Sequence, residues 1–265
     1  MLSNVDYHIT DVCNLKCVCC NHFCPLVPAN TPHKSLNQIT KDMLALSKFK
    51  DIVPQISILG GEPTLHPELT TILKLIRCIF PSANLLLVTN GTNWKKFEEW
   101  KEVIWENNIK IYISSYPYCE DYEQRNHHII DVIGAEYCTY DDSYRLQHGP
   151  LVLTPKYTED DCHHCRMRGY CCQLKDEKLY LCNYAAQINY LFDAFPITRK
   201  YIELDGKEYV DLTDPNLTID DIGYMVYGSF PSICKYCMEG TRWEDHNMVF
   251  VDWKRSDRKM EEWVN

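Results

Sequence analysis

Three cysteines near the start of the chain have a spacing that suits metal chemistry. Cys13, Cys17 and Cys20 form the pattern CxxxCxxC directly after a predicted strand at residues 5–10. Three thiolates on one short loop can bind three of the four irons of a [4Fe–4S] cluster and leave the fourth iron open to chelate another molecule. Thiolates at short spacing also suit a tetrahedral zinc ion. The spacing therefore indicates a metal site and leaves an iron–sulfur cluster and zinc as alternatives.

A second motif, Gly60-Gly61-Glu62-Pro63, follows another predicted strand at residues 55–59. Glycine allows a backbone to approach a ligand closely, and the Glu62 carboxylate can bind an ammonium group. Taken alone, the segment could be an ordinary turn between a strand and a helix. Because ligands bind at the carboxyl ends of parallel strands, we expect the two motifs to lie together.

Together the two motifs resemble the radical S-adenosylmethionine (radical SAM) superfamily, and the resemblance extends over most of the chain. It implies that the three cysteines hold a [4Fe–4S] cluster whose open iron takes the amino and carboxylate groups of S-adenosylmethionine. It also implies that Gly60, Gly61 and Glu62 bind the amino group. The implied chemistry is reductive cleavage of the sulfonium to a 5′-deoxyadenosyl radical, which abstracts hydrogen from a substrate.

The same resemblance implies further contacts to S-adenosylmethionine. Thr89 and Asn90 begin the sequence Thr-Asn-Gly after the third predicted strand, which matches a motif seen in many relatives. Ser114 matches a polar position near the carboxylate or the ribose. These three residues could instead cap the ends of their strands, so both readings stay open.

One position departs from the family pattern. The residue before the third cysteine is often aromatic in the family and is Cys19 here. We therefore expect adenine to pack against the nearby pair His22 and Phe23, with Phe23 as the contact. Cys19 could imitate a ligand, but the spacing favours Cys20.

Cysteines return in the second half of the chain, in a pattern that resembles the auxiliary-cluster domains called SPASM or twitch. In those domains a cysteine and a spacer precede Gly-x-x-x-x-Cys, and a Cys-x-x-Cys pair follows. The segment ending at Cys182 matches except at the glycine, Cys234 and Cys237 supply the later pair, and the upstream ligand is either Cys165 or Cys172. The resemblance implies an auxiliary Fe–S cluster, a [4Fe–4S] cluster suited to electron transfer, and a structural zinc site is the alternative.

Cys119 lies in the loop after a predicted strand at residues 109–114, on the face where we expect the substrate. A thiol there could return a hydrogen atom to a substrate radical, as an epimerase requires. A lone cysteine in a loop is more often inert. We assign Cys119 as a candidate catalytic hydrogen donor.

The elements that position these residues alternate between strands and amphipathic helices over the first half of the chain. Four such units in series predict a parallel sheet with right-handed crossovers. We expect an α/β fold: a partial (β/α)6 TIM-type barrel in a radical SAM core at residues 1–145, and a small cysteine-rich auxiliary-cluster domain with a C-terminal helix at 146–265. The predicted strands are 5–10, 55–59, 85–88 and 109–114, and the predicted helices run from 37 or 40 to 49, 67–80, 94–107 and 120–133.

Composition limits the classes of protein. The chain has 265 residues, 15 cysteines and a formal net charge of −10. A chain of this length can bury a core without disulfides, and the sequence starts without a signal peptide pattern, so we expect a cytoplasmic protein with free or metal-bound thiols. Acidity without a basic tract disfavours a nucleic-acid partner, and no apolar run is long enough for a membrane span.

Two features narrow the expected reaction. The first strand begins near residue 5, which leaves no room for the leader-binding domain of many peptide-modifying relatives, and the second half has cysteines for one auxiliary cluster. This resembles carbohydrate or cyclitol dehydrogenases. We expect hydrogen abstraction from a small polar, carbohydrate-like substrate, followed by dehydrogenation or epimerisation, with flavodoxin or ferredoxin as electron donor. The alternatives are a peptide-modifying enzyme with a separate recognition partner and a zinc-binding interaction protein.

Overall fold

The computed structural model describes residues 2–114, 121–141, 146–147, 150–163, 165, 167–237, 250–251 and 254–265. Cys119, our candidate hydrogen donor, lies outside these residues. Within them, no helix combines the length and the apolar character needed to cross a lipid bilayer.

One sheet of eight strands organises the described chain, in the order β5-β4-β3-β2-β1-β7-β8-β9. Strands β1 to β5 are parallel to their neighbours, β7 pairs parallel with β1, and β8 and β9 are antiparallel. The α/β fold is therefore confirmed. The strands are β1 Val5–Thr10, β2 Gln55–Gly60, β3 Asn84–Thr89, β4 Ile109–Ser114, β5 Cys138–Asp141, β7 Cys172–Lys175, β8 Lys178–Tyr180 and β9 Tyr209–Asp211.

The barrel is partial, as expected, but its sixth parallel strand is in a different place from a simple series. Strand β7 lies beside β1, with Val5 opposite Cys172, and does not follow β5. Among the described strands the sheet has two edges, at β5 and β9, so the barrel is not closed. Strands β6 (Leu146–Gln147) and β10 (Phe250–Val251) form a separate antiparallel pair.

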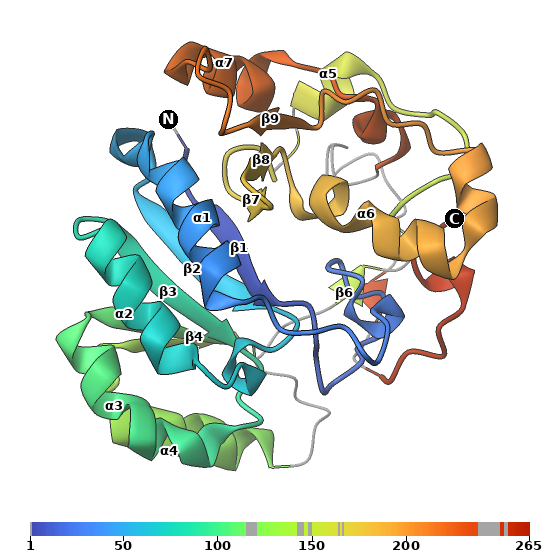
Figure 1. Ribbon diagram of the computed structural model, residues 1–265. Coiled ribbons are helices and arrows are strands. Elements are labelled where there is room, and N and C mark those ends of the chain that lie inside the picture. The colour runs from blue at the N-terminus through green and yellow to red at the C-terminus, as the bar shows by residue number, and fades with distance from the viewer. Residues whose placement is uncertain are drawn as a thin grey trace.

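Four helices follow the first four strands and lie together on one side of the sheet (Figure 1). Their apolar faces pack on the strands; in α2, for example, Leu69, Ile72, Leu73 and Ile76 are buried. The first helix begins earlier than expected, because the Ser35 side chain accepts a hydrogen bond from the backbone N–H of Gln38 and caps it. The helices are α1 Leu36–Ser47, α2 Leu69–Ile79, α3 Phe97–Glu106 and α4 Tyr122–Ile133.

The later elements extend and cover this sheet. The expected hairpin is formed by β7 and β8, which place Asp176 and Glu177 in the left-handed region at φ 51° and 59°. Helix α6 lies beyond this hairpin, on the side away from α1 (Figure 1). The remaining elements are α5 Glu159–His163, α6 Asn183–Ala194, α7 Ile219–Gly223, the π-helical turn η6 Tyr224–Gly228, and the short 3₁₀ helices η1 Cys24–Leu26, η2 Lys50–Ile52, η3 Pro63–Leu65, η4 Trp94–Lys96, η5 Pro196–Lys200, η7 Ser232–Tyr236 and η9 Met260–Glu262.

The described residues form two large apolar cores. The larger lies between the sheet and α1–α4, and β7 and β8 contribute to it. The smaller joins Phe23, Tyr184 on α6 and Trp263 near the end of the chain. Strands β7 to β9 thus continue the sheet of the first half beyond residue 145, while the second core gathers residues from both halves. The division at 145/146 stays a prediction.

Candidate functional site

The first cysteine motif and most of its expected partners line one cavity at the carboxyl ends of β1 to β4. This cavity brings together nine of the residues predicted for the site: Cys13, Cys17, Cys20, Gly60, Gly61, Glu62, Thr89, Asn90 and Ser114. Its other lining residues are Leu15, Asn21, His22, Cys24, Leu59 and Val88. Strands β1 to β4 are parallel and end at the same edge of the sheet. This brings their residues together, although they are far apart in the chain.

Glu62 is the carboxylate of this cavity and is almost fully buried, at 1% exposure. One of its oxygens accepts hydrogen bonds from the Thr89 hydroxyl at 2.7 Å and from the Thr64 backbone N–H at 3.0 Å. The other oxygen accepts from the Asn90 backbone N–H at 2.7 Å. Burial raises the pKa of Glu62, and these hydrogen bonds oppose that shift. The carboxylate is therefore held in one orientation by the ends of β2 and β3.

The two glycines before Glu62 allow two stretches of backbone to meet. A Cβ atom on Gly61 would lie 2.1 Å from the carbonyl oxygen of Val12, and one on Gly60 would lie 1.9 Å from that of Thr10. Because of this approach, the Gly61 N–H donates to Thr10 and the Glu62 N–H donates to Val12, each at 2.8 Å. We expect the glycines to make room for a ligand, and in the structure their missing side chains also make room for the residues that lead into the cysteine loop.

Residues near the end of the chain form hydrogen bonds with the cysteine loop. The Val18 N–H donates to the carbonyl of Lys254 at 2.9 Å, and the Ser256 N–H donates to the carbonyl of Lys16 at 2.9 Å. The indole N–H of Trp263 donates to the Cys20 carbonyl, also at 2.9 Å. We expected a C-terminal helix; the described residues form only the three-residue helix η9 and these contacts. No local sequence signal pointed to this strap of residues 254–263.

The thiols of the first cavity have distinct environments. The Cys24 thiol hydrogen-bonds to Cys20, which lowers the pKa of Cys20 to about 7, while burial raises the pKa of Cys13 to about 11. Sequence reasoning missed Cys24, whose side chain also lines the cavity. Cys19 is buried in a small apolar cluster with Cys17 and Val18 and is not among the lining residues. This placement agrees with Cys20, not Cys19, as the third residue of the motif.

Phe23, the expected adenine contact, points elsewhere. It takes a left-handed conformation at φ 55° and is fully buried against Tyr184 and Trp263. Its neighbour His22 lines the cavity instead. His22 shares a hydrogen bond of 2.8 Å with His8, and burial lowers the pKa of His22 to about 3, so the imidazole beside the cavity is neutral.

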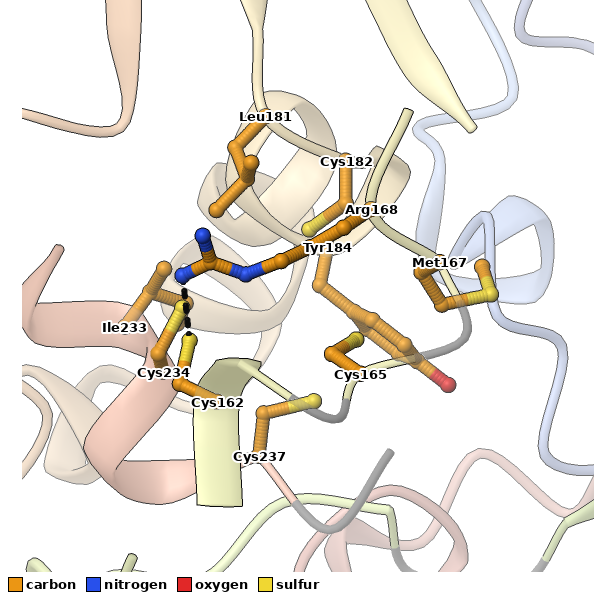
Figure 2. A pocket seen from close by; sticks show the side chains of 10 residues that line it. All are labelled: Cys162, Cys165, Met167, Arg168, Leu181, Cys182, Tyr184, Ile233, Cys234 and Cys237. Atoms are coloured by element: carbon orange, nitrogen blue, oxygen red, sulfur yellow. Dashed lines mark hydrogen bonds between the residues drawn. The ribbon is translucent and has the colours of Figure 1, made fainter. Parts of the chain in front are cut away.

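A second cavity is lined by five cysteines, shown in Figure 2: Cys162, Cys165, Cys182, Cys234 and Cys237. Helix α5 and the residues after it, the end of β8 and η7 supply them. Cys162 was missed from the sequence, although it precedes Cys165 by three positions, which is one helical turn.

Cys172, the other candidate upstream ligand, is not brought to this cavity. It lies on β7, is fully buried, and belongs to the large core with Leu174. Burial raises the pKa of Cys172 to about 12. The reason is strand geometry: residues 172 and 174 share one face of β7, and that face packs against the core.

Cys162 and Cys234, two of the five, are hydrogen-bonded to each other. A hydrogen bond from the Cys234 thiol lowers the pKa of Cys162 to about 6, with help from Arg168, whose Nη2 lies 2.8 Å from the Cys162 Sγ. The pKa of Cys234 is raised for the same reason. Within the described part of the chain, no three His, Cys, Asp or Glu side chains form a group that could hold a single metal ion. The thiols instead surround two cavities.

Comparison with known proteins identifies the first part of the chain. The family model described as Radical SAM superfamily matches residues 7–117. A GTP 3',8-cyclase of Vibrio vulnificus (strain YJ016) is 31% identical over 111 residues, which are 40% of this chain and 32% of the cyclase. The match thus spans about a third of the cyclase.

Two solved structures share the fold over nearly the whole chain. BtrN in complex with AdoMet and 2-DOIA has a TM-score of 0.57 and 17% identity, covering 89% of this chain and 93% of BtrN. BtrN in an open conformation has a TM-score of 0.50 and 15% identity, covering 96% of each chain. Radical SAM domains bind a [4Fe–4S] cluster and S-adenosylmethionine, and the donor set fits both, since three thiols and a buried carboxylate face one cavity. The match to the Radical SAM superfamily model identifies residues 7–117, which contain both motifs, as a radical SAM domain.

Proposed function

We propose that this enzyme oxidises a small polar, carbohydrate-like substrate by hydrogen abstraction, and that it passes an electron from the substrate to an auxiliary [4Fe–4S] cluster. The observation that carries the proposal is the second cysteine-lined cavity. Tyr184 lines this cavity and packs edge-on against Phe23, with ring centroids 6.0 Å apart, and Phe23 follows the first cysteine motif. A second electron-accepting site so near the first suits a net oxidation.

The first cavity would hold the catalytic cofactors. Cys13, Cys17 and Cys20 would bind the cluster, and Glu62, Asn90 and Ser114 would contact S-adenosylmethionine, together with Gly60, Gly61 and Thr89. When bound, this group supplies a 5′-deoxyadenosyl radical after uptake of one electron from a donor such as flavodoxin or ferredoxin. The protein's part is to hold the carboxylate and to close the cysteine loop with the strap of residues 254–263. His22, neutral in this environment, replaces Phe23 as the proposed neighbour of the adenine.

In the second cavity we assign Cys165, Cys182, Cys234 and Cys237 as ligands. Thiolates on different irons of a cubane are farther apart than two hydrogen-bonded sulfurs, so Cys162 and Cys234 cannot both take a corner as placed. Cys234 belongs to the Cys-x-x-Cys pair, and this leaves Cys162 as the fifth thiol. Four protein ligands close the cluster to substrate and suit electron transfer.

The proposed reaction balances as a two-electron oxidation of a carbinol to a carbonyl. The substrate C–H bond would break and its hydrogen atom would be taken up as 5′-deoxyadenosine, the product that bound S-adenosylmethionine supplies. The substrate carbon would then lose one electron, for which the auxiliary cluster would be the acceptor, and the hydroxyl proton would go to solvent as the C=O bond forms. The similarity in fold to BtrN, solved with AdoMet and 2-DOIA, supports a small substrate for this chain. In an epimerisation, Cys119 would return the hydrogen atom instead.

Two measurements on anaerobically purified, reconstituted protein test the proposal. Iron and sulfide analysis should give two clusters per chain, and Cys13→Ser should lose one of them, while Cys78→Ser, an exposed thiol of α2, should lose none. A panel of carbinol-deuterated sugars and cyclitols should include one that transfers deuterium to 5′-deoxyadenosine and yields a product that has lost this deuterium and one hydrogen. A colourless zinc protein, or activity with peptides alone, would contradict the proposal. An isomer that carries hydrogen in place of the carbinol deuterium would indicate epimerisation.

A further inference from the structure

Arg168 places a buried cation at the wall of the second cavity. The residue is 7% exposed and follows α5, and its side chain lies among the five cysteines in Figure 2. Its Nη1 donates to the Val226 carbonyl at 2.9 Å, and its Nη2 donates to the Ser229 carbonyl at 2.7 Å. Nη2 also lies 2.8 Å from the Cys162 sulfur. These bonds fix the guanidinium plane relative to the cavity.

One donor of this guanidinium has no partner. The Nε–H of Arg168 is buried and makes no hydrogen bond to any described residue. A buried donor without a hydrogen-bond partner destabilises the folded protein, and more so when it belongs to a charged group. None of the hydrogen bonds of Arg168 within the described residues reaches a carboxylate. The side chain therefore offers a free N–H beside the thiols, and its positive charge faces the Cys162 sulfur and no described carboxylate.

An iron–sulfur cluster in this cavity would supply what Arg168 lacks. A [4Fe–4S] cluster with four thiolates carries a net negative charge, which becomes more negative when the cluster takes up an electron. Hydrogen bonds to cluster sulfurs and nearby charge set the reduction potential of such clusters. In a low-dielectric site the electrostatic attraction between a cation and a cluster is strong, because little solvent screens it.

We propose that Arg168 donates its Nε–H to a sulfur of the auxiliary cluster and raises the reduction potential of that cluster, so that it accepts an electron from the substrate radical. In this step the cluster gains one electron, and the substrate carbon radical loses one electron and its hydroxyl proton to become a carbonyl. Arg168 is a positioning and tuning residue, and it does not touch the substrate. The inference rests on the proposed auxiliary cluster but not on the identity of the substrate.

The test measures the potential of each cluster in the full-length holoenzyme by EPR-monitored redox titration. Addition of S-adenosylmethionine changes the signal of the radical SAM cluster only, which separates the two signals. Arg168→Gln keeps an N–H for the Val226 or Ser229 carbonyl and removes the charge. We expect it to shift the auxiliary potential to more negative values and to leave the other cluster unchanged. The matched control is Arg199→Met, because Arg199 is half-exposed and pairs with Asp193 on the surface.

A second measurement uses the unsubstituted protein and does not depend on how the variant folds. With ¹⁵N-arginine incorporated, pulsed EPR of the reduced auxiliary cluster should show coupling to one guanidinium nitrogen, and this coupling should vanish in Arg168→Gln. An unchanged potential with both clusters retained would overturn the inference, as would the absence of coupling in the unsubstituted protein. In that case Arg168 only holds Cys162 and the Val226 and Ser229 carbonyls in place. Loss of the proposed function itself looks different, because metal analysis would then find one cluster per chain.

Discussion

The indole N–H of Trp263 donates a hydrogen bond to the backbone carbonyl of Cys20, although the two residues are 243 positions apart in the chain. Trp263 is fully buried and also packs against Phe23. The bond therefore joins the last residues of the chain to the third cysteine of the radical SAM motif. The strap of residues 254–263 thus contacts the cysteine loop directly.

Trp263→Phe should weaken this connection and keep the aromatic packing. We expect a loss of about 1–3 kcal/mol in the free energy of unfolding, because the Cys20 carbonyl loses a buried donor. We also expect less iron in the first cluster after anaerobic reconstitution. Trp105→Phe is the matched control: it removes an indole hydrogen bond to the Ile133 carbonyl, 2.7 Å long, on α3. Equal cluster content in both variants would contradict the role of the strap.

Gly61→Ala should disrupt the approach between the end of β2 and the cysteine loop. Its Cβ would lie 2.1 Å from the Val12 carbonyl oxygen, so the backbone has to move. We expect destabilisation of about 1–3 kcal/mol or more, together with loss of the first cluster. Gly223→Ala should stabilise the protein by about 0.4–1 kcal/mol, since nothing lies within 4 Å of the added methyl group and the residue is helical. Chemical denaturation of the two variants measures the change in the free energy of unfolding, and iron analysis measures their cluster content.

Glu62→Gln should weaken the binding of S-adenosylmethionine. The amide keeps one acceptor oxygen but loses the negative charge of the carboxylate, which now accepts hydrogen bonds from the Thr89 hydroxyl and the Asn90 backbone N–H. Hydrogen bonds to a charged group contribute about 1.5–3 kcal/mol, so we expect an affinity lower by about 10- to 100-fold in equilibrium binding to the reconstituted enzyme. The control is Glu68→Gln, which changes an exposed carboxylate six positions later. This variant should bind S-adenosylmethionine with unchanged affinity. Unchanged affinity in Glu62→Gln would rule out its proposed contact.

The cysteines of the second half should separate into two classes. Cys165→Ser, Cys182→Ser and Cys237→Ser should each lose the auxiliary cluster, as seen in iron and sulfide content. Cys162→Ser and Cys172→Ser should retain it, because the first is the fifth thiol of the cavity and the second lies in the core. Retention in Cys165→Ser with loss in Cys162→Ser would show that these two thiols exchange roles.

Asp6 should give stability a pH dependence. Burial raises its pKa from 3.8 to about 7 in the folded protein. Because the folded state holds the proton more tightly, its contribution is fully present below pH 3.8, is lost as pH rises toward 7, and levels off above that. The slope is at most about 1.4 kcal/mol per pH unit. Asp6→Asn should flatten the decline in unfolding free energy measured from pH 5.5 to 7; an equally steep decline would contradict this assignment.

The sequence by itself determined the local features of this protein. The bounds of β1 and β4 agree with the predicted strands, and α1 to α4 follow the predicted helices to within a few residues. The three cysteines and Glu62 share one cavity with Thr89 and Asn90 of the Thr-Asn-Gly motif, as the parallel βα pattern predicts. These features depend on residue type and short-range periodicity, which the sequence displays directly.

Only the tertiary structure decided how distant segments meet. Cys172 and Cys165 were equivalent candidates in sequence, but the pairing of β7 with β1 turns Cys172 into the core, and the packing of α5 against η7 brings Cys162 and Arg168 to the cavity. Phe23 does not line the cofactor site, because its backbone is left-handed and its side chain packs against Tyr184. The strap of residues 254–263 pairs with a loop at the other end of the chain. Such contacts arise from sheet order and burial of shared surface, which no local pattern encodes.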